Sequence, residues 1–336
     1  MKAIVCQEPH RLAVATREPP VPKAGEVLIR IRRVGLCGTD FHIYGGRHPY
    51  LTYPRVMGHE LAGEIEHAPQ GSTFQVGQVV AVNPYLACGT CLACRRGKPN
   101  ACANISVLGV HADGGMCELL AVPESAVIDA TGLSLDEAAL LEFLSIGAHA
   151  VARATISSGD RVLIVGAGPI GIAAALFARL DGASITLVDQ RRSRLDYARS
   201  RLGFDDIVEA DAALAETLRA KTDGEFFDVA IDATGSIAAM NNALSYLGHG
   251  GKLVFVGVSP GEIQFDDPEF HKRETTLIAS RNALPGDFAR VIGAMKRGDI
   301  KASDLQTHSV IGEEMPVRLP ELIAEADHVL KAVASF

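Results

Sequence analysis

The stretch Arg161-Val-Leu-Ile-Val-Gly-Ala-Gly-Pro-Ile-Gly171 decides the fold. Its first half is a short apolar run that is typical of a buried strand. Its second half contains the pattern Gly-x-Gly-x-x-Gly and leads into an apolar segment of helix length, 170–180. The glycines permit a tight turn and a close approach of the backbone to a pyrophosphate, whose charge the helix N-terminus favours. We therefore predict a dinucleotide-binding turn formed by Gly166, Gly168, Pro169, Ile170 and Gly171.

Short apolar strands continue beyond this motif and alternate with segments that are mostly long enough for helices. That alternation is typical of a parallel sheet covered by helices on both faces, so we predict a doubly wound α/β domain over 149–280. The longest uncharged run, 162–178, is shorter than the about 20 residues of a membrane-spanning helix, and glycines and a proline interrupt it. The six predicted strands are 161–165, 184–188, 206–208, 227–231, 252–256 and 275–279.

Asp189 ends the second of these strands, 23 residues after Gly166. A carboxylate at this position accepts hydrogen bonds from a ribose diol and repels a 2′-phosphate, which favours NAD over NADP. Arg191, Arg192 and Arg194 follow closely. They either form the solvated start of the next helix or tolerate a 2′-phosphate, and we count Arg194 among the expected cofactor contacts.

The rest of the chain of 336 residues has a different pattern. The first 145 or so residues alternate short apolar runs with glycine and proline, which predicts short strands, many turns and few helices. After residue 280 we predict a helix over 287–296 and a final apolar stretch, 329–333, that returns to the first domain. The sequence thus predicts a β-rich domain formed by 1–148 and 281–336 beside the dinucleotide-binding domain.

Composition excludes several classes of protein. The content of 48% hydrophobic and 21% charged residues is that of a globular chain, not of a disordered one. The formal net charge of −8 provides no excess of positive charge to bind nucleic acid or an anionic membrane, so we expect a small-molecule ligand. The start MKAIVCQEPHR lacks the long apolar region of a secretory signal, and we expect a cytoplasmic protein.

Four of the seven cysteines are closely spaced. Their pattern C-x2-C-x2-C-x7-C lets four thiolates converge on one tetrahedral ion, and such a closed site is typical of structural zinc. An iron–sulfur cluster is the chemical alternative, although nothing else in the chain indicates electron transfer. Two further cysteines, Cys6 and Cys117, are expected to be small buried residues. The predicted ligands of the structural zinc are Cys88, Cys91, Cys94 and Cys102.

A second set of metal-binding residue types is spread over three segments of the first domain. Cys37 lies in Cys-Gly-Thr-Asp-Phe-His, His59 and Glu60 are adjacent, and Glu142 comes much later. Each is weak evidence alone, because such residues usually have structural roles. One thiolate, one imidazole and one or two carboxylates suit a zinc ion that keeps a position free for water or substrate, which is the arrangement of a catalytic ion.

These motifs together resemble the zinc-dependent medium-chain alcohol and polyol dehydrogenases, in particular the sorbitol-dehydrogenase branch, over essentially the whole chain. The resemblance implies a GroES-like β-rich catalytic domain joined to a Rossmann dinucleotide-binding domain, two zinc ions per chain and a homo-oligomer, either a dimer or a tetramer. It implies that Cys37 and His59 bind the catalytic zinc, that Glu60 is a ligand or a near neighbour, and that Glu142 is a ligand or holds a water.

The same resemblance assigns supporting roles to nearby residues. Asp40 corresponds to the carboxylate that orients the zinc-binding His59 and fixes its tautomer. Thr39 and His42 match the family's proton relay, and the unperturbed pKa of histidine, about 6.5, suits proton transfer to water. Phe143 departs from the pattern, because many members of this branch have proline after the glutamate.

Two stretches bear on the substrate. Residues 267–274 with 280–283, and residues 107–115, resemble the L-galactonate and L-gulonate 5-dehydrogenases, which oxidise a hydroxyl of a sugar acid. In that case Arg281 would bind the carboxylate with its planar guanidinium group, whereas the alternative is that it pairs with an acidic neighbour or lines the domain hinge. Arg47 and His48 are weaker candidates for contacts to sugar hydroxyls.

Other functions compete with this hypothesis. A neutral polyol or an L-threonine-type secondary alcohol is the nearer alternative, since specificity depends on side chains and not on the fold. A non-catalytic nucleotide-sensing or scaffold protein is the alternative of another class. The retained set of Cys37, His59, Glu60 and Glu142 argues against it.

Overall fold

The computed structural model describes residues 1–48 and 51–336 and divides the chain into two compact units. Unit 1 comprises Met1–Phe143 and Leu284–Phe336, and unit 2 comprises Leu144–Ala283. Helix α4 (Leu141–Ala154) carries the chain from the first unit into the second. In the part of the chain that the structure describes, no helix has the length and apolar character needed to cross a bilayer.

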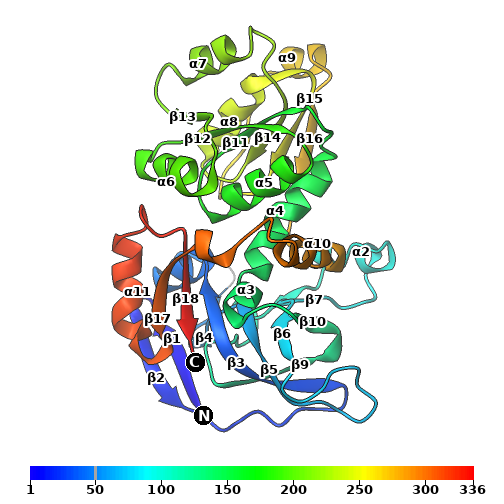
Figure 1. Ribbon diagram of the computed structural model, residues 1–336, viewed down its shortest axis with the longest axis vertical. Coiled ribbons are helices and arrows are strands. Elements are labelled where there is room, and N and C mark those ends of the chain that lie inside the picture. The colour runs from blue at the N-terminus through cyan, green and yellow to red at the C-terminus, as the bar shows by residue number, and fades with distance from the viewer. Residues whose placement is uncertain (49–50) are drawn as a thin grey trace. The chain divides into compact units, whose positions relative to one another are not determined.

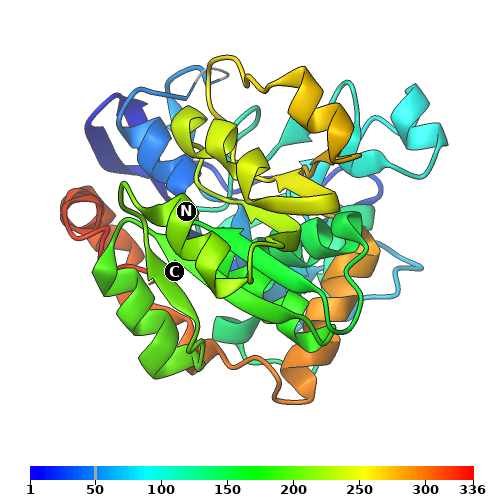
Figure 2. The ribbon, with the colours of Figure 1, turned by 90° about the horizontal axis from the view of Figure 1, so that it is seen from above.

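Unit 2 is built around a six-stranded parallel sheet with the strand order β13-β12-β11-β14-β15-β16. Helices α5 and α6 lie on one face of this sheet and α7, α8 and α9 on the other, so the unit is doubly wound (Figure 1, Figure 2). The strands are β11 (Arg161–Val165), β12 (Ser184–Asp189), β13 (Ile207–Glu209), β14 (Phe227–Asp232), β15 (Leu247–Phe255) and β16 (Thr276–Ala279). The helices are α5 (Pro169–Leu180), α6 (Arg192–Leu202), α7 (Leu214–Lys221), α8 (Ile237–Ala243), the 3-10 turn η3 (Leu244–Tyr246) and α9 (Asp267–Lys272).

All six predicted strands are present, and one begins five residues earlier than predicted. Strand β15 begins at Leu247, although the prediction began at residue 252. The segment between contains Gly248, Gly250 and Gly251, which favour a turn by sequence alone. In the structure Leu247 pairs with Phe227 across a register shift, so the glycine-rich segment is an irregular start of the strand.

The turn between β11 and α5 has the glycine geometry that the motif predicts. Gly166 has φ +99°, a left-handed conformation that side chains rarely adopt. A Cβ at Gly171 would collide with the carbonyl oxygen of Gly166, so the helix can begin this close to the strand only with glycine there. Helix α5 begins with Pro169 in its first turn, where the missing N–H costs no hydrogen bond.

Unit 1 is dominated by a seven-stranded sheet in which β10, β6, β5, β3, β18 and β17 follow one another and β9 also pairs with β3. A second sheet has the order β2-β1-β4, and β7 pairs with β8. The strands are β1 (Lys2–Glu8), β2 (Arg11–Thr16), β3 (Glu26–Leu36), β4 (Arg55–Val56), β5 (Glu60–His67), β6 (Val79–Val82), β7 (Tyr85–Leu86), β8 (Ser106–Val107), β9 (Leu119–Pro123), β10 (Val127–Asp129), β17 (Gln306–Ile311) and β18 (Lys331–Ser335).

The described part of the first 145 residues contains few helices, as predicted, and they are short. The predicted helix over 287–296 is α10, which begins two residues earlier at Pro285. The helices of unit 1 are α1 (Gly38–Tyr44), α2 (Leu92–Arg95), α3 (Leu135–Ala139), α10 (Pro285–Lys296) and α11 (Met315–Ala324), with the 3-10 turns η1 (Pro99–Ala101), η2 (Glu124–Ala126), η4 (Ala302–Asp304) and η5 (Gly312–Glu314).

The C-terminal strand returns to unit 1, as the sequence predicted. Strand β18 lies between β3, to which it is antiparallel, and β17, to which it is parallel (Figure 1). Its pattern is almost wholly buried, and Ala332 and Ala334 belong to the apolar core of this unit. The last strand of the chain is therefore an interior strand of the sheet that starts near the N-terminus.

We expect Gly147→Ala to destabilise the protein, although alanine is the better helix former by up to about 1 kcal/mol. A Cβ at this position of α4 would lie 2.5 Å from both the Ala173 Cβ and the Ala174 N of α5, and such overpacking typically costs about 1–3 kcal/mol. Gly286→Ala in α10 is the matched control, because a Cβ there meets no atom within 4 Å. The midpoint of urea denaturation should fall for the first variant and stay or rise for the second; equal midpoints would contradict the close contact.

Candidate functional site

The four predicted cysteine ligands meet in one loop of unit 1. Their Sγ atoms all lie within 4.8 Å of one another, and the closest pairs are separated by 3.5 to 3.9 Å. These separations are too long for disulfides, and all four thiols are free. A tetrahedron with metal–sulfur distances of about 2.3 Å has edges of about 3.8 Å, so the sulfur positions fit one tetrahedral zinc ion.

Hydrogen bonds from the backbone of this loop stabilise negative charge on two of its sulfur atoms. Hydrogen bonds from the backbone N–H groups of Thr90 and Cys91 lower the pKa of Cys88 to about 5. The Cys102 Sγ accepts hydrogen bonds from the N–H groups of Cys88 and Asn104, both at 3.3 Å. Burial and the neighbouring thiols raise the pKa of Cys94 to about 12, because several thiolates this close repel one another without a cation. The donor set therefore fits a bound cation.

A second group of possible metal ligands consists of Cys37, His59 and Glu60, whose ligand atoms also lie within 4.8 Å of one another. Cys37 caps the N-terminus of α1, and Glu60 is the first residue of β5. The side chains of Glu60 and His59 are both buried, and the His59 ring forms a hydrogen bond with the Cys37 side chain. Although burial alone would lower the pKa of His59, its bond to Cys37 and the nearby negative charges raise it well above the ordinary value.

Asp40 and His59 contain buried polar atoms that lack partners among the described residues. These atoms are the Asp40 Oδ1 and the His59 Nδ1, whereas the other carboxylate oxygen of Asp40 accepts a hydrogen bond from the Cys37 N at 2.9 Å. Burial raises the pKa of Asp40, and the charge of His59 opposes that rise. This interaction accords with the predicted role of Asp40 in orienting His59, which stays a prediction.

Glu142 is buried but falls outside the group of three. Its carboxylate accepts a hydrogen bond from the Tyr85 hydroxyl, a residue that the sequence analysis missed. Burial raises the pKa of Glu142 to about 7, the charge of His59 opposes this rise and that of Glu60 adds to it. Glu142 therefore interacts with both His59 and Glu60, although of the two glutamates only Glu60 lies within 4.8 Å of the Cys37 and His59 ligand atoms.

Lys331 is the second residue that the sequence analysis missed. Its side chain is 1% exposed, and its Nζ donates to both carboxylate oxygens of Glu60, at 2.7 and 2.8 Å. Burial acts to lower the pKa of Lys331, but Glu60, Cys37 and Glu142 together raise it. A single lysine inside the apolar stretch that ends the chain was the available signal, because a buried lysine requires a partner.

The predicted proton-relay residues lie on α1. The Thr39 Oγ1 is 3.7 Å from the Cys37 Sγ, so its hydroxyl adjoins the candidate metal ligands. His42 is exposed, two residues before the end of the helix. Partial burial of its ring and the positive charge of Arg47 lower the pKa of His42 below 6.5. His48 follows in the loop, and its pKa is lowered by burial and by the neighbouring His111 and His42.

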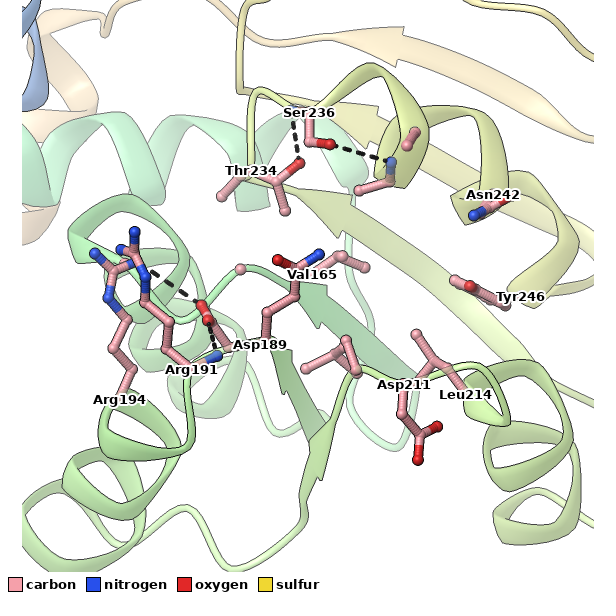
Figure 3. Close-up of a pocket in the computed structure, with 18 residues that line it drawn as sticks. Val165, Asp189, Arg191, Arg194, Asp211, Leu214, Thr234, Ser236, Asn242 and Tyr246 are labelled. Atoms are coloured by element: carbon pink, nitrogen blue, oxygen red, sulfur yellow. Dashed lines mark hydrogen bonds and ion pairs between the residues drawn. The ribbon is translucent and has the colours of Figure 1, made fainter. Parts of the chain in front are cut away.

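Unit 2 contains a cavity of about 500 Å³ at the carboxyl ends of its strands. Asp189 lies at the end of β12 with Arg191 and Arg194 beside it, and Tyr246 and Asn242 lie on the opposite side (Figure 3). The Asp189 carboxylate accepts hydrogen bonds from the Ala167 N at 2.7 Å and the Arg191 N at 2.8 Å. The cavity therefore joins the glycine turn to the acidic end of the second strand, as a dinucleotide requires.

Three arginines of unit 2 named in the sequence analysis differ in their contacts. The Arg194 Nη1 is 3.9 Å from the Asp189 carboxylate and would be 3.4 Å from a Cβ at Gly168, so it lies near the glycine turn. Arg192 instead pairs with Asp196 in its own helix. Arg281 is exposed and follows β16 in unit 2, and its predicted role as a carboxylate ligand stays a prediction.

Comparison with known proteins bears on both units. Residues 23–132 match the model of the alcohol dehydrogenase GroES-like domain, and residues 169–297 match that of the zinc-binding dehydrogenase domain. The chain is 46% identical over 309 residues to L-galactonate-5-dehydrogenase of Escherichia coli K12, covering 92% of this chain and 91% of that one. It is 34% identical over 321 residues to an L-threonine 3-dehydrogenase of Rhizobium etli, covering 92% of each.

Solved structures agree with this assignment. The alcohol dehydrogenase RspB of Escherichia coli CFT073, solved in complex with NADH, superposes with a TM-score of 0.94 at 30% identity, covering 100% of this chain and 99% of that one. The predicted fold, a GroES-like domain with a Rossmann domain, is confirmed, as is the prediction of an enzyme rather than a sensing or scaffold protein. The chain belongs to the zinc-dependent medium-chain alcohol and polyol dehydrogenases.

Proposed function

We propose that this enzyme oxidises a secondary hydroxyl of a sugar acid of the L-galactonate or L-gulonate type and transfers the hydride to NAD. The observation that carries the proposal is the 46% identity to L-galactonate-5-dehydrogenase over 92% of the chain. A neutral polyol or an L-threonine-type alcohol is the second candidate, which is supported by the 34% identity to L-threonine 3-dehydrogenase.

Cys37 and His59 would hold the catalytic zinc, with Glu60 and Glu142 as the acidic residues at its edge. The donor set fits, because a thiol, an imidazole and a carboxylate oxygen meet within 4.8 Å. Zinc bound there would supply Lewis-acid polarisation of the substrate hydroxyl. Asp40 would orient His59, whose charge acts on the buried Asp40 carboxylate. The cysteine loop of residues 88–102 would hold a structural zinc, since four protein ligands leave no open position.

Thr39 and His42 would carry the proton that leaves the substrate hydroxyl. The Thr39 hydroxyl lies beside Cys37, where it would accept a proton and donate its own. His42 is exposed at the far end of the same helix and would release the proton to water. Its lowered pKa keeps the imidazole neutral, and therefore able to accept a proton, to lower pH than an ordinary histidine.

The glycine turn and Asp189 would bind the dinucleotide. The turn formed by Gly166, Gly168, Pro169, Ile170 and Gly171 would bring the backbone N–H groups of its residues other than proline to the pyrophosphate. The buried Asp189 carboxylate favours the ribose diol of NAD over a 2′-phosphate. Arg194 adjoins both features and would contact the cofactor near the turn.

A substrate panel tests the proposal. We expect zinc-loaded enzyme to reduce NAD faster with L-galactonate or L-gulonate than with D-sorbitol, L-threonine or a simple secondary alcohol, and to use NADP less well. Arg281→Ala should raise KM for the hexonate about 10- to 100-fold, since a hydrogen bond to a charged group contributes about 1.5–3 kcal/mol. KM for sorbitol should hardly change.

Arg192→Ala is the matched control for this panel, because Arg192 is also an exposed arginine of unit 2, and its ion pair is with Asp196 in its own helix. It should leave both KM values unchanged. Preference for a neutral alcohol by the unmodified enzyme would exclude the sugar-acid substrate. Equal effects of Arg281→Ala on both substrates would exclude the carboxylate contact.

The relay predicts a specific pH dependence. His42 accepts a proton only when neutral, so alcohol oxidation declines as the pH falls through the pKa of His42. Arg47→Ala removes a positive neighbour that lowers this pKa, so the pKa and the acid limb of kcat should both move to higher pH. The His42 ring proton, followed by NMR without substrate, gives the pKa directly.

Arg11→Ala controls for the loss of a surface arginine, because Arg11 pairs with Glu8. Its acid limb should match that of the unmodified enzyme. His42→Gln should remove the acid limb together with much of the activity. An acid limb that stays in place when the His42 pKa moves would assign the proton transfer to another group.

A further inference from the structure

Unit 2 contains two buried side-chain atoms that have no hydrogen-bond partner among the described residues. They are the Asp232 Oδ2 and the Ser280 Oγ; Asp232 is completely buried and Ser280 is 7% exposed. Folded proteins pair nearly all of their buried polar atoms, because a buried group without a partner loses the hydrogen bonds that water gave it. Such an atom beside a ligand site is explained when the ligand supplies the missing partner.

Two other buried hydroxyls of unit 2 are satisfied by the chain itself. The Thr186 Oγ1 in β12 donates to the Asp206 carboxylate at 2.5 Å, and the Thr222 Oγ1 donates to the Leu218 carbonyl oxygen at 2.9 Å. The missing partner of Ser280 is therefore not a general property of buried hydroxyls in this unit.

Asp232 and Ser280 both lie at the carboxyl edge of the parallel sheet. Asp232 is the last residue of β14, and Ser280 directly follows β16. The register places Asp232, Phe255 and Ala279 in one row across β14, β15 and β16. The Ser280 N–H continues the hydrogen bonding of the sheet, since it donates to the Phe255 carbonyl oxygen at 2.9 Å. The backbone of Ser280 is thus fixed by the sheet, whereas its hydroxyl has no partner among the described residues.

The strand order indicates which part of a dinucleotide would lie at this edge. Strands β13, β12 and β11 lie on one side of the point where the order reverses, and β14, β15 and β16 lie on the other. The pyrophosphate would lie at the glycine turn after β11, and the adenosine ribose at Asp189, which ends β12. The nicotinamide riboside is attached to the opposite end of the pyrophosphate. It would therefore extend over the ends of β14, β15 and β16.

Asp232 and Ser280 occupy different parts of this edge. The Asp232 Oδ1 accepts hydrogen bonds from the Thr234 N at 3.0 Å and the Thr234 Oγ1 at 2.9 Å. A Cβ at Gly166 would lie 3.1 Å from the Thr234 methyl group, so this turn adjoins the pyrophosphate end of the site. Ser280 follows the strand two places beyond β14, about 10 Å further along the edge. Ser280 is thus the unpartnered group at the nicotinamide end.

A serine hydroxyl suits the carboxamide of nicotinamide. The hydroxyl both donates and accepts hydrogen bonds. A carboxamide has a carbonyl oxygen that accepts and an NH2 group that donates, as in the side chain of asparagine. The two groups are therefore complementary whichever way the carboxamide is turned.

We propose that the Ser280 hydroxyl is a cofactor-binding group that forms a hydrogen bond with the carboxamide of the nicotinamide ring. The inference rests on the proposed function, which uses NAD. A single rotatable bond joins the ring to its ribose, so a hydrogen bond to the carboxamide restricts the rotation of the ring. It thereby helps to fix which face of the ring receives the hydride.

The variant Ser280→Ala tests this contact by binding measurements on the full-length enzyme. We expect its Kd for NADH to rise about 2- to 13-fold, which is the range for the loss of one neutral hydrogen bond. Its Kd for ADP-ribose, which lacks the nicotinamide ring, should equal that of the unmodified enzyme. Titration calorimetry with each ligand provides both values.

The stability of the ligand-free enzyme separates this role from a structural one. Ser280→Ala removes a buried hydroxyl that has no partner in the described chain, so the midpoint of urea denaturation should rise or stay the same. Thr222→Val is the matched control, because it removes a buried hydroxyl that donates to Leu218. It should lower the midpoint and leave the Kd for NADH unchanged.

Three results would overturn the proposal. They are an unchanged Kd for NADH in Ser280→Ala, an equal loss of affinity for NADH and ADP-ribose, and a midpoint that falls as far as in Thr222→Val. An unchanged Kd for NADH together with a raised KM for the alcohol would assign the hydroxyl to the substrate instead. If the unmodified enzyme binds NADPH but not NADH, the proposed cofactor fails, and NADPH, which has the same carboxamide, replaces NADH in the test of Ser280.

Discussion

The buried ion pair between Glu60 and Lys331 constrains the course of the whole chain in unit 1. Removing each charge from water costs several kcal/mol, and close contact with further hydrogen bonds is needed to offset that cost. Both oxygens of Glu60 and the Leu36 carbonyl provide these contacts. Strand β18 must therefore lie beside β3, which requires the end of the chain to leave unit 2 and return to the sheet formed by its first residues.

Features encoded by local spacing could be predicted from the sequence. The turn at Gly166–Gly171 depends on steric limits within six residues, and the four-cysteine loop depends on spacings within fifteen residues. The geometry of both is therefore set by residues that are close in sequence. The six strands of unit 2 were predicted because buried parallel strands are continuous apolar runs. The early start of β15 was not predicted, because its glycines favour a turn and lie at a register shift between the Phe227–Leu247 and Val229–Lys252 pairs.

Contacts between distant segments could be predicted only in part. The family resemblance indicated Cys37, His59 and Glu60, and the structure brings them together. Lys331 and Tyr85 belong to no sequence motif. Their contacts with Glu60 and Glu142 form only because β18 and β7 lie near those residues in the fold. The lysine is 271 positions from its partner, and no local pattern encodes such a pairing. A buried lysine is nevertheless a physical signal, since an apolar strand tolerates that charge only with an acidic partner.

The charges around Cys37, His59 and Glu60 explain why these residues suit a divalent ion. Cys37, Asp40, Glu60 and Glu142 would contribute up to four negative charges, and among these neighbouring groups Lys331 is the permanent cation. Burial, with a smaller contribution from the charge of Glu60, raises the pKa of Glu142 to about 7 and also raises that of Asp40. A dication reduces this excess of negative charge, and the fixed charge of Lys331 lowers the charge that the ion must balance. In the cysteine loop, burial and the neighbouring thiols raise the pKa of Cys94 to about 12, so a cation would also relieve the repulsion among its four thiolates. The four thiols would leave no open position on a tetrahedral ion, whereas Cys37, His59 and Glu60 would leave one.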